Sequence, residues 1–235
     1  MMLEVQNIHS YFGQSHILQG VSLKVDRGEI VLLSGRNGAG KTTTIRSIIG
    51  LVPPRSGQIT FLGENITGTP VHLISQKGMS LVPEGRKIIP GLTVYENLKL
   101  ATLKNKDKAK TEAMFEQITQ IFPRLKERWN QEGTSLSGGE QQMLAIARAL
   151  VSDPALILVD EPSEGLSPIM VEKISEVLKE IQKKGTTILL VEQNTDMALE
   201  ISSRCYLMDE GVIKFEGSPE EIKANEEIQR EYLAI

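Results

Sequence analysis

Gly35-Arg36-Asn37-Gly38-Ala39-Gly40-Lys41-Thr42-Thr43 has the residue spacing of a phosphate-binding loop. Its glycines allow successive backbone N–H groups to turn toward a β-phosphate, and Lys41 is placed to reach the β- and γ-phosphates. Thr42 supplies a hydroxyl for Mg²⁺. We therefore expect this loop to bind ATP with Mg²⁺, because no other common ligand uses all of these features.

The sequence on either side of the loop predicts a strand and a helix. Ile30 to Leu33 is a continuous apolar run, which is typical of a strand buried on both faces of a parallel sheet. After the loop, Ile45, Ile48 and Ile49 recur at helical spacing. Strand, loop and helix thus follow one another in the order that a phosphate site requires.

The rest of the chain predicts an α/β fold with two additions. Apolar runs at 156–159 and 188–191 flank a helical pattern, as in a parallel sheet with crossover helices. Alternating apolar residues over 3–8 and 21–25 predict an antiparallel flap, and helical stripes dominate 85–150. We predict one domain over residues 1–235, with a core at 1–84 and 151–217, a helical insertion at 85–150, and a C-terminal strand and helix at 211–235.

A capping box is visible near the C-terminus, in Ser218-Pro219-Glu220-Glu221. Proline at the first helical position is also typical of a helix start. We expect one helix to run from here toward Tyr232.

Composition argues against several classes of protein. The formal net charge is −4, from 26 basic and 30 acidic residues, and it lacks the excess of positive charge that is typical of a nucleic-acid-binding protein. The single cysteine, Cys205, excludes an internal disulfide. The apolar runs are far shorter than the roughly 20 residues of a membrane helix, and no secretory signal is recognisable. We expect a cytoplasmic protein.

Two carboxylates stand at the end of the predicted strand 156–159. Asp160 is the natural outer partner of Mg²⁺, and Glu161 is then available to polarise the water that attacks the γ-phosphate. A purely structural Asp-Glu pair at a strand end remains the alternative. The phosphate loop upstream favours the catalytic interpretation.

A second motif, Leu136-Ser137-Gly138-Gly139-Glu140-Gln141, precedes an apolar-periodic helix. The phosphate loop, this signature motif and Asp160-Glu161 follow one another in the sequence. Because of these three motifs, residues 3–217 resemble the nucleotide-binding subunit of an ATP-binding-cassette (ABC) transporter. The resemblance implies a RecA-like core with an antiparallel β subdomain and a helical subdomain. It also implies a head-to-tail dimer in which Ser137, Gly138, Gly139 and Glu140 cover the ATP of the partner.

The resemblance assigns further roles and reveals departures from the family pattern. An aromatic residue before a glycine stacks on adenine in this family; Phe12 has that position here, and Tyr11 is the competing candidate. Glu84 stands where most members carry a glutamine that contacts Mg²⁺ and the attacking water. Ser167 replaces the usual aspartate of the next loop, and Gln193 replaces the switch histidine at the γ-phosphate.

These departures narrow the subfamily. The segments Val82 to Arg86, Gly165 to Pro168 and Val191 to Asn194 look like those of an ATPase subunit of branched-chain (hydrophobic) amino acid importers, and importers of urea or short amides share much of them. The implied partners are two transmembrane permease subunits, a second ABC ATPase or a second copy of this chain, and indirectly an extracytoplasmic solute-binding protein. The implied location is the cytoplasmic face of the membrane.

Three alternatives remain open from the sequence. The chain could be a soluble cassette ATPase without a transport role, or a nucleotide-dependent scaffold whose hydrolysis is slow because of Glu84 and Gln193. The apolar residues between Glu84 and Asn97 could receive a coupling helix of a permease or belong to the ordinary core of the helical subdomain.

Overall fold

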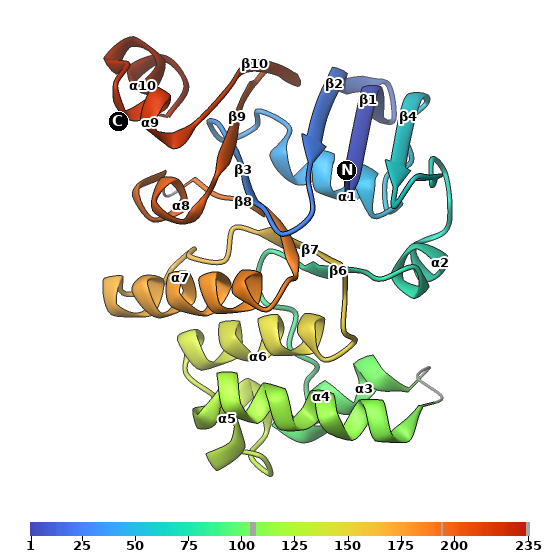
Figure 1. Cartoon of the computed structure of the whole chain (residues 1–235), viewed down its shortest axis with the longest axis vertical. Helices are drawn as coiled ribbons and strands as arrows, with labels where there is room; N and C mark the ends of the chain where they lie inside the picture. Colours follow the sequence, from blue (N-terminus) through green and yellow to red (C-terminus); the bar gives the residue numbers. More distant parts are fainter. Residues whose placement is uncertain (104–106, 194, 234–235) are drawn as a thin grey trace.

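Two β-sheets and a separate group of helices make up the part of the chain that the computed structural model describes, residues 1–103, 107–193 and 195–233 (Figure 1). One sheet has the strand order β10-β9-β3-β8-β7-β6, and the other has the order β2-β1-β4-β5. Within these residues, no helix combines the length and the apolar character needed to cross a membrane. The α/β fold with an antiparallel subdomain and a helical subdomain is confirmed.

The six-stranded sheet is parallel except at one edge. Every residue of β3, β7 and β8 is buried, which explains their unbroken apolar sequences. β3 lies between β8 and β9, with Leu32 opposite Leu190 on one side and Cys205 on the other. β10 pairs antiparallel with β9. The strands are β3 (Ile30–Ser34), β6 (Met79–Val82), β7 (Leu156–Asp160), β8 (Thr187–Val191), β9 (Arg204–Asp209) and β10 (Val212–Gly217).

The antiparallel sheet covers one side of this core. Its apolar residues alternate with exposed ones and share a hydrophobic cluster with α1 and with Val31, Leu33 and Leu189 of the parallel sheet. Both sheets therefore hold α1 between them, next to the phosphate loop. The elements of this side are β1 (Leu3–Phe12), β2 (Ser15–Val25), α1 (Lys41–Ile48), β4 (Ser56–Phe61), β5 (Glu64–Asn65) and α2 (Val71–Gln76).

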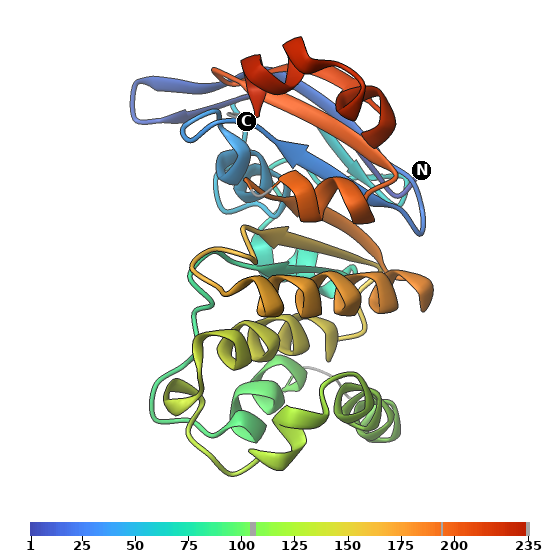
Figure 2. The same cartoon turned by 90° about the vertical axis from the view of Figure 1, so that its left-hand side faces the viewer.

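The helical subdomain is inserted between β6 and β7. Figures 1 and 2 both place it at the end of the molecule beyond α7 (Pro168–Lys183). Thr93 and Ser137 begin two of its helices with capping boxes. Its members are α3 (Val94–Thr102), α4 (Lys108–Ile121), α5 (Pro123–Glu127), the 3₁₀ turn η1 (Gly133–Ser135) and α6 (Gly138–Leu150).

The C-terminal part corrects one prediction. The capping box at Ser218 is present and starts α9 (Pro219–Lys223), but the single helix toward Tyr232 is wrong. The side chain of Asn225 accepts hydrogen bonds from the backbone N–H groups of Glu227 and Ile228, at 3.1 Å each, and starts a second helix, α10 (Glu226–Tyr232). The local capping bonds of asparagine compete with helix continuation at this point. Helix α8 (Thr195–Ile201) precedes β9.

The turn between β9 and β10 ties the two sheets to the phosphate loop. Gly211 donates its N–H to the carbonyl of Ala39 at 2.9 Å, and its own carbonyl accepts the N–H of Gln19 at 2.8 Å. Its φ is +79°, and a Cβ atom at this position would lie 2.0 Å from the carbonyl oxygen of Ile17. Only glycine fits without displacing β2.

We expect Gly211→Ala to lower the free energy of unfolding by about 2 kcal/mol or more, because both backbone strain and a steric clash oppose the methyl group. Gly63→Ala is the matched control, since Gly63 has a similar φ of +82° but open space around its Cβ position. It should cost about 1 kcal/mol. Urea denaturation of both variants measures the difference; equal losses would contradict the steric role of Gly211.

Candidate nucleotide-binding site

The phosphate loop connects β3 to α1, as predicted. Gly35, Gly38 and Gly40 have φ values of 151°, 82° and 109°, which favour glycine. A Cβ atom on Gly35 would lie 2.1 Å from the carbonyl oxygen of Met208 in β9. The loop is thus pressed against its neighbouring strand, and its backbone N–H groups lie at the start of α1.

Lys41 is buried inside this loop, with 4% of its surface exposed. Its ammonium group donates to the carbonyls of Gly35 and Arg36, at 2.9 and 3.1 Å. It also lies 3.6 Å from the carboxylate of Glu161. The cation is therefore held at the centre of the site by two loop carbonyls and one carboxylate.

Thr42 and Asp160 bring two oxygen atoms together. The Thr42 hydroxyl donates to Oδ1 of Asp160 at 3.1 Å. Burial raises the pKa of Asp160 to about 6; the nearby Glu161 and Glu84 also raise it, while the Thr42 hydrogen bond works in the opposite direction. A carboxylate that burial and like charges disfavour gains from a nearby cation.

This oxygen pair fits Mg²⁺. Mg²⁺ is typically held by one or two protein oxygens and completes its shell with water and phosphate oxygens. No group of three or more His, Cys, Asp or Glu side chains in the described ranges is arranged to hold a metal by itself. A site made of Thr42, Asp160 and a nucleotide needs no such group.

Glu161 has an unusual backbone conformation. Its φ is +46°, which is uncommon for a residue with a side chain, and its N–H donates to the carbonyl of Val191 in β8 at 2.9 Å. The neighbouring strand thus holds the strained residue in place. Strain of this kind is concentrated at functional sites, where it orients a side chain.

One pocket collects most of the predicted residues. Phe12 is 48% exposed at its wall, whereas the competing Tyr11 stacks on His16 at a centroid distance of 4.2 Å and does not line it. Asp160 does not line the pocket itself but accepts a hydrogen bond from Thr42, which does. Three residues of the predicted loop are also absent from the lining: Gly35, Arg36 and Ala39. The lining residues are Phe12, Ile17, Asn37, Gly38, Gly40, Lys41, Thr42, Thr43, Glu84, Glu161, Glu164 and Gln193.

The charge of this pocket is strongly asymmetric. Its lining contains three carboxylates, Glu84, Glu161 and Glu164, and Asp160 lies just behind Thr42. Lys41 is the one cation among the described residues that line it. The side chains that line the pocket therefore carry more negative than positive charge, and the loop N–H groups and a bound Mg²⁺ would have to offset it.

Gln193 is positioned by a residue that sequence reasoning missed. Glu192 is 1% exposed; its Oε1 accepts the N–H of Ser163 at 2.8 Å, and its Oε2 accepts the N–H of Gln193 at 3.1 Å. Its backbone carbonyl accepts the hydroxyl of Ser34 at 2.9 Å. Glu192 thereby connects the end of β3 with the loops after β7 and β8. An acidic residue directly after a buried strand was the available signal. Asn194 lies outside the described residues.

The signature motif lies elsewhere. Ser137 caps α6, and its hydroxyl and N–H both donate to the carboxylate of Glu140. Although burial opposes it, these bonds and the ion pair with Arg128 at 2.7 Å hold the pKa of Glu140 below its usual value. Ser137, Gly138, Gly139 and Glu140 do not line the pocket. The fold does not bring them to the phosphate loop of the same chain.

One arginine lies against the signature, and a second holds the backbone of the first. Arg86 lies against Gly138, since a Cβ atom there would be 3.0 Å from Nη1 of Arg86. Arg148 of α6 donates to the backbone carbonyls of Lys87 and Arg86, at 2.8 and 3.1 Å. The two residues whose carbonyls accept these bonds have positive φ, 63° for Arg86 and 48° for Lys87. Sequence reasoning missed Arg148, whose role depends on a loop 61 residues away.

Other predicted positions have structural surroundings of their own. Ser167 is the N-cap of α7 without a side-chain capping bond. Arg36 points away from the pocket lining and donates to the carbonyl of Arg230 in α10 at 3.2 Å. Gly139 is covered by Met170, whose methyl carbon would be 2.4 Å from a Cβ atom there.

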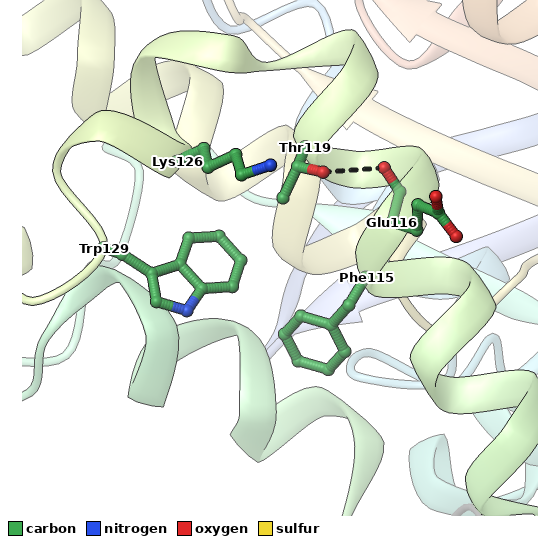
Figure 3. A pocket seen from close by; sticks show the side chains of 5 residues that line it. All are labelled: Phe115, Glu116, Thr119, Lys126 and Trp129. Atoms are coloured by element: carbon green, nitrogen blue, oxygen red, sulfur yellow. Dashed lines mark hydrogen bonds between the residues drawn. The ribbon is translucent and has the colours of Figure 1, made fainter.

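A second hollow lies on the helical subdomain. Figure 3 shows the rings of Phe115 and Trp129 on one side and the side chains of Lys126 and Thr119 on the other, with the carboxylate of Glu116 turned away. The Thr119 hydroxyl donates to the Glu116 carbonyl at 2.8 Å. This hollow contains none of the predicted site residues, so the nucleotide chemistry belongs to the phosphate-loop pocket.

Comparisons with known proteins agree with this geometry. The family model described as "ABC transporter" matches residues 18–164. The chain is 40% identical to the high-affinity branched-chain amino acid transport ATP-binding protein BraG of Pseudomonas aeruginosa, over 99% of both chains. It is 35% identical to the lipopolysaccharide export system ATP-binding protein LptB of Haemophilus influenzae, over 99% of this chain and 97% of that protein.

Solved structures give the same result. A structure described as the ATP-binding subunit of an ABC transporter superposes with a TM-score of 0.85 at 30% identity, covering 100% of this chain and 97% of that one. Fold, phosphate loop and relatives lead to one family. The chain belongs to the ATP-binding cassettes of ABC transporters, which are ATPases.

Proposed function

We propose that this ATPase is the energy-coupling subunit of an importer for branched-chain or other hydrophobic amino acids. The observation that carries the proposal is the 40% identity with BraG over 99% of both chains. The segments around Glu84, Ser167 and Gln193 support it, because they look like those of the same importer subfamily. Importers of urea or short amides remain an alternative substrate class.

The working unit in this proposal is a head-to-tail dimer. The signature residues stand outside the pocket that contains Lys41 and Glu161, and in this proposal a second chain supplies them. The partner is a second copy of this chain or a related ABC ATPase. ATP between the two chains then holds the dimer together, and hydrolysis reopens it.

The residues of the pocket divide the chemistry among them. Phe12 stacks on adenine, the loop N–H groups and Lys41 bind the phosphates, and Gln193 donates an amide hydrogen bond to the γ-phosphate. Thr42 and Asp160, with Glu84 nearby, would hold Mg²⁺, which neutralises phosphate charge when bound. Glu161 orients and deprotonates the attacking water.

The transport proposal is tested by purifying the chain from its native cells in mild detergent. Two membrane-spanning permease subunits, a second cassette ATPase and ATP hydrolysis stimulated by leucine-like amino acids with a solute-binding protein are the expected result. Stimulation by urea instead would change the substrate class. Recovery with soluble proteins alone would contradict the transport role and the location at the cytoplasmic face of the membrane.

A second candidate function comes from the similarity to LptB. That protein is named for lipopolysaccharide export and is 35% identical to this chain. An export role predicts co-purification with a lipid-extracting complex and no stimulation by amino acids. The higher identity with BraG favours import.

We expect Glu161→Gln to reduce turnover by about 10² or more, because a positioned general base is lost. ATP binding should persist, and the variant should accumulate as an ATP-bound dimer, because only hydrolysis reopens it. Phosphate release and size-exclusion chromatography with ATP measure the two effects. Turnover close to that of the wild type would remove Glu161 from the role of base.

Lys41→Ala should act on binding rather than on chemistry alone. The buried ammonium group is the cation that the chain itself offers to the phosphates. We expect the affinity for ATP to fall by about tenfold or more, which corresponds to about 1.4 kcal/mol. Equilibrium binding of a fluorescent ATP analogue measures it. Unchanged affinity would show that the loop binds phosphate without this side chain.

Asp160→Asn should stabilise the nucleotide-free protein at neutral pH. Because the folded-state pKa is about 6 and the ordinary value is 3.8, the free energy of unfolding falls as pH rises through this window. Asparagine removes the buried charge and can still accept the Thr42 bond. We expect a gain of about 1 to 3 kcal/mol at pH 8 that disappears near pH 4. Thermal unfolding without Mg²⁺ tests this; a loss at pH 8 would contradict it.

A further inference from the structure

The side chains that line the nucleotide pocket carry more negative than positive charge. Glu84, Glu161 and Glu164 line it, Asp160 lies behind Thr42, and Lys41 is the single cation of its described lining. Phosphoryl transfer depends on cations that stabilise negative charge on the transferred group. Gln193 can donate a hydrogen bond but cannot become a cation. Besides Mg²⁺, which Thr42 and Asp160 would hold, any further cation would come from outside this lining.

Arg86 is a cation placed at the signature motif. Its guanidinium lies against Gly138, and Nη2 donates to the carbonyl of Glu164 at 3.4 Å. Arg86 is half-buried and forms no ion pair within the ranges that the structure describes. Arg86 therefore lies beside the positive end of α6, whose first turn contains the carboxylate of Glu140, and a phosphate that arrives there would interact favourably with Arg86 and with the helix end.

The position of Arg86 is set by its backbone. Arg86 and Lys87 both have positive φ, and Arg148 donates to the carbonyl of Arg86 at 3.1 Å and to that of Lys87 at 2.8 Å. Arg148 belongs to the helix that begins with the signature. The same helix thus supplies Gly138 and holds the loop that carries Arg86, so guanidinium and signature move as one unit. A strained conformation maintained in this way is typical of functional segments.

We propose that Arg86 is a catalytic residue that acts in trans, contacting the γ-phosphate of the ATP bound by the partner chain. This inference rests on the proposed head-to-tail dimer, in which the signature of one chain faces the phosphate loop of the other. Because Arg86 lies against Gly138, it would approach the γ-phosphate of the partner's ATP together with the signature. It supplies the charge that Gln193 cannot carry, and its planar group can form two hydrogen bonds to phosphate oxygens.

Single variants give the first test. Arg86→Ala should lower kcat by about tenfold or more and change the affinity of the monomer for ATP much less, because Arg86 does not line the pocket of its own chain and, among the described residues, contacts it only through the carbonyl of Glu164. Arg86→Lys should restore part of the rate. Lys87→Ala is the matched control: it removes a neighbouring exposed cation from the same strained pair and should keep the wild-type kcat. Equal effects at both positions would overturn the proposal.

Mixing variants tests whether the contact crosses the dimer. A dimer of Lys41→Ala and Arg86→Ala chains has one complete site only if Arg86 acts on the partner's ATP. Each variant alone should be slow, and their equimolar mixture should recover about a quarter of the wild-type rate, since half of randomly paired two-fold dimers contain one such site. No recovery, with the control below active, would overturn the role in trans.

The control separates this inference from the dimer itself. Lys41→Ala mixed with Gly138→Asp, which blocks the signature, should recover activity in any head-to-tail dimer. Recovery with Gly138→Asp but not with Arg86→Ala overturns the role of Arg86 alone. Failure of both mixtures overturns the proposed dimer and the role of Arg86 with it.

Discussion

The burial of β3, β7 and β8 on both faces is the constraint on which the rest of the structure depends. Strands buried in this way pair in parallel, and the carboxyl ends of parallel strands lie at one edge of the sheet. That edge receives the phosphate loop after β3, Asp160 at the end of β7 and Gln193 after β8. Residues from four distant parts of the sequence, including Glu84 after β6, meet because four strands end together. The chemistry of the pocket follows from this alignment more than from any single motif.

Two features of the nucleotide site lower the stability of the folded chain when no ligand is bound. Asp160 is buried beside other carboxylates, and the φ of Glu161 is one that side chains rarely adopt. Neither feature helps the chain to fold. Both become favourable when cations and phosphate oxygens arrive, because a buried carboxylate then gains a partner and an oriented side chain gains a substrate. The surrounding scaffold compensates through fully buried strands and through Glu192, which connects the end of β3 with the loops after β7 and β8 by hydrogen bonds.

Local patterns predicted the fold well because their causes are local. The loop from Gly35 to Thr43, the apolar strands and the capped signature helix each depend on neighbouring residues, and the structure contains all three. The sequence pattern missed the break of the last helix at Asn225. There, a few hydrogen bonds from the backbone to the Asn225 side chain compete with the backbone bonds that would continue the helix. The contact of Arg148 with Arg86 was invisible, because it depends on backbone strain and on a separation of 62 residues. Phe12 and Tyr11 could not be separated by composition; the strand directs neighbouring side chains to opposite faces, and only Phe12 lines the pocket.

The place of β3 in the sheet has a consequence for biosynthesis. Its two neighbours are β8 and β9, which end at Val191 and Asp209, whereas the phosphate loop begins directly after Ser34. A chain growing on the ribosome therefore carries every residue of that loop long before the strands that hold it exist. Until β8 and β9 are made, the apolar residues of β3 lack the strands with which they pair, and contacts between distant parts of a sequence form slowly and leave apolar surface exposed to aggregation. The sheet around β3 can therefore close only after β9 has been made, so the phosphate loop is synthesised early and is held in place late.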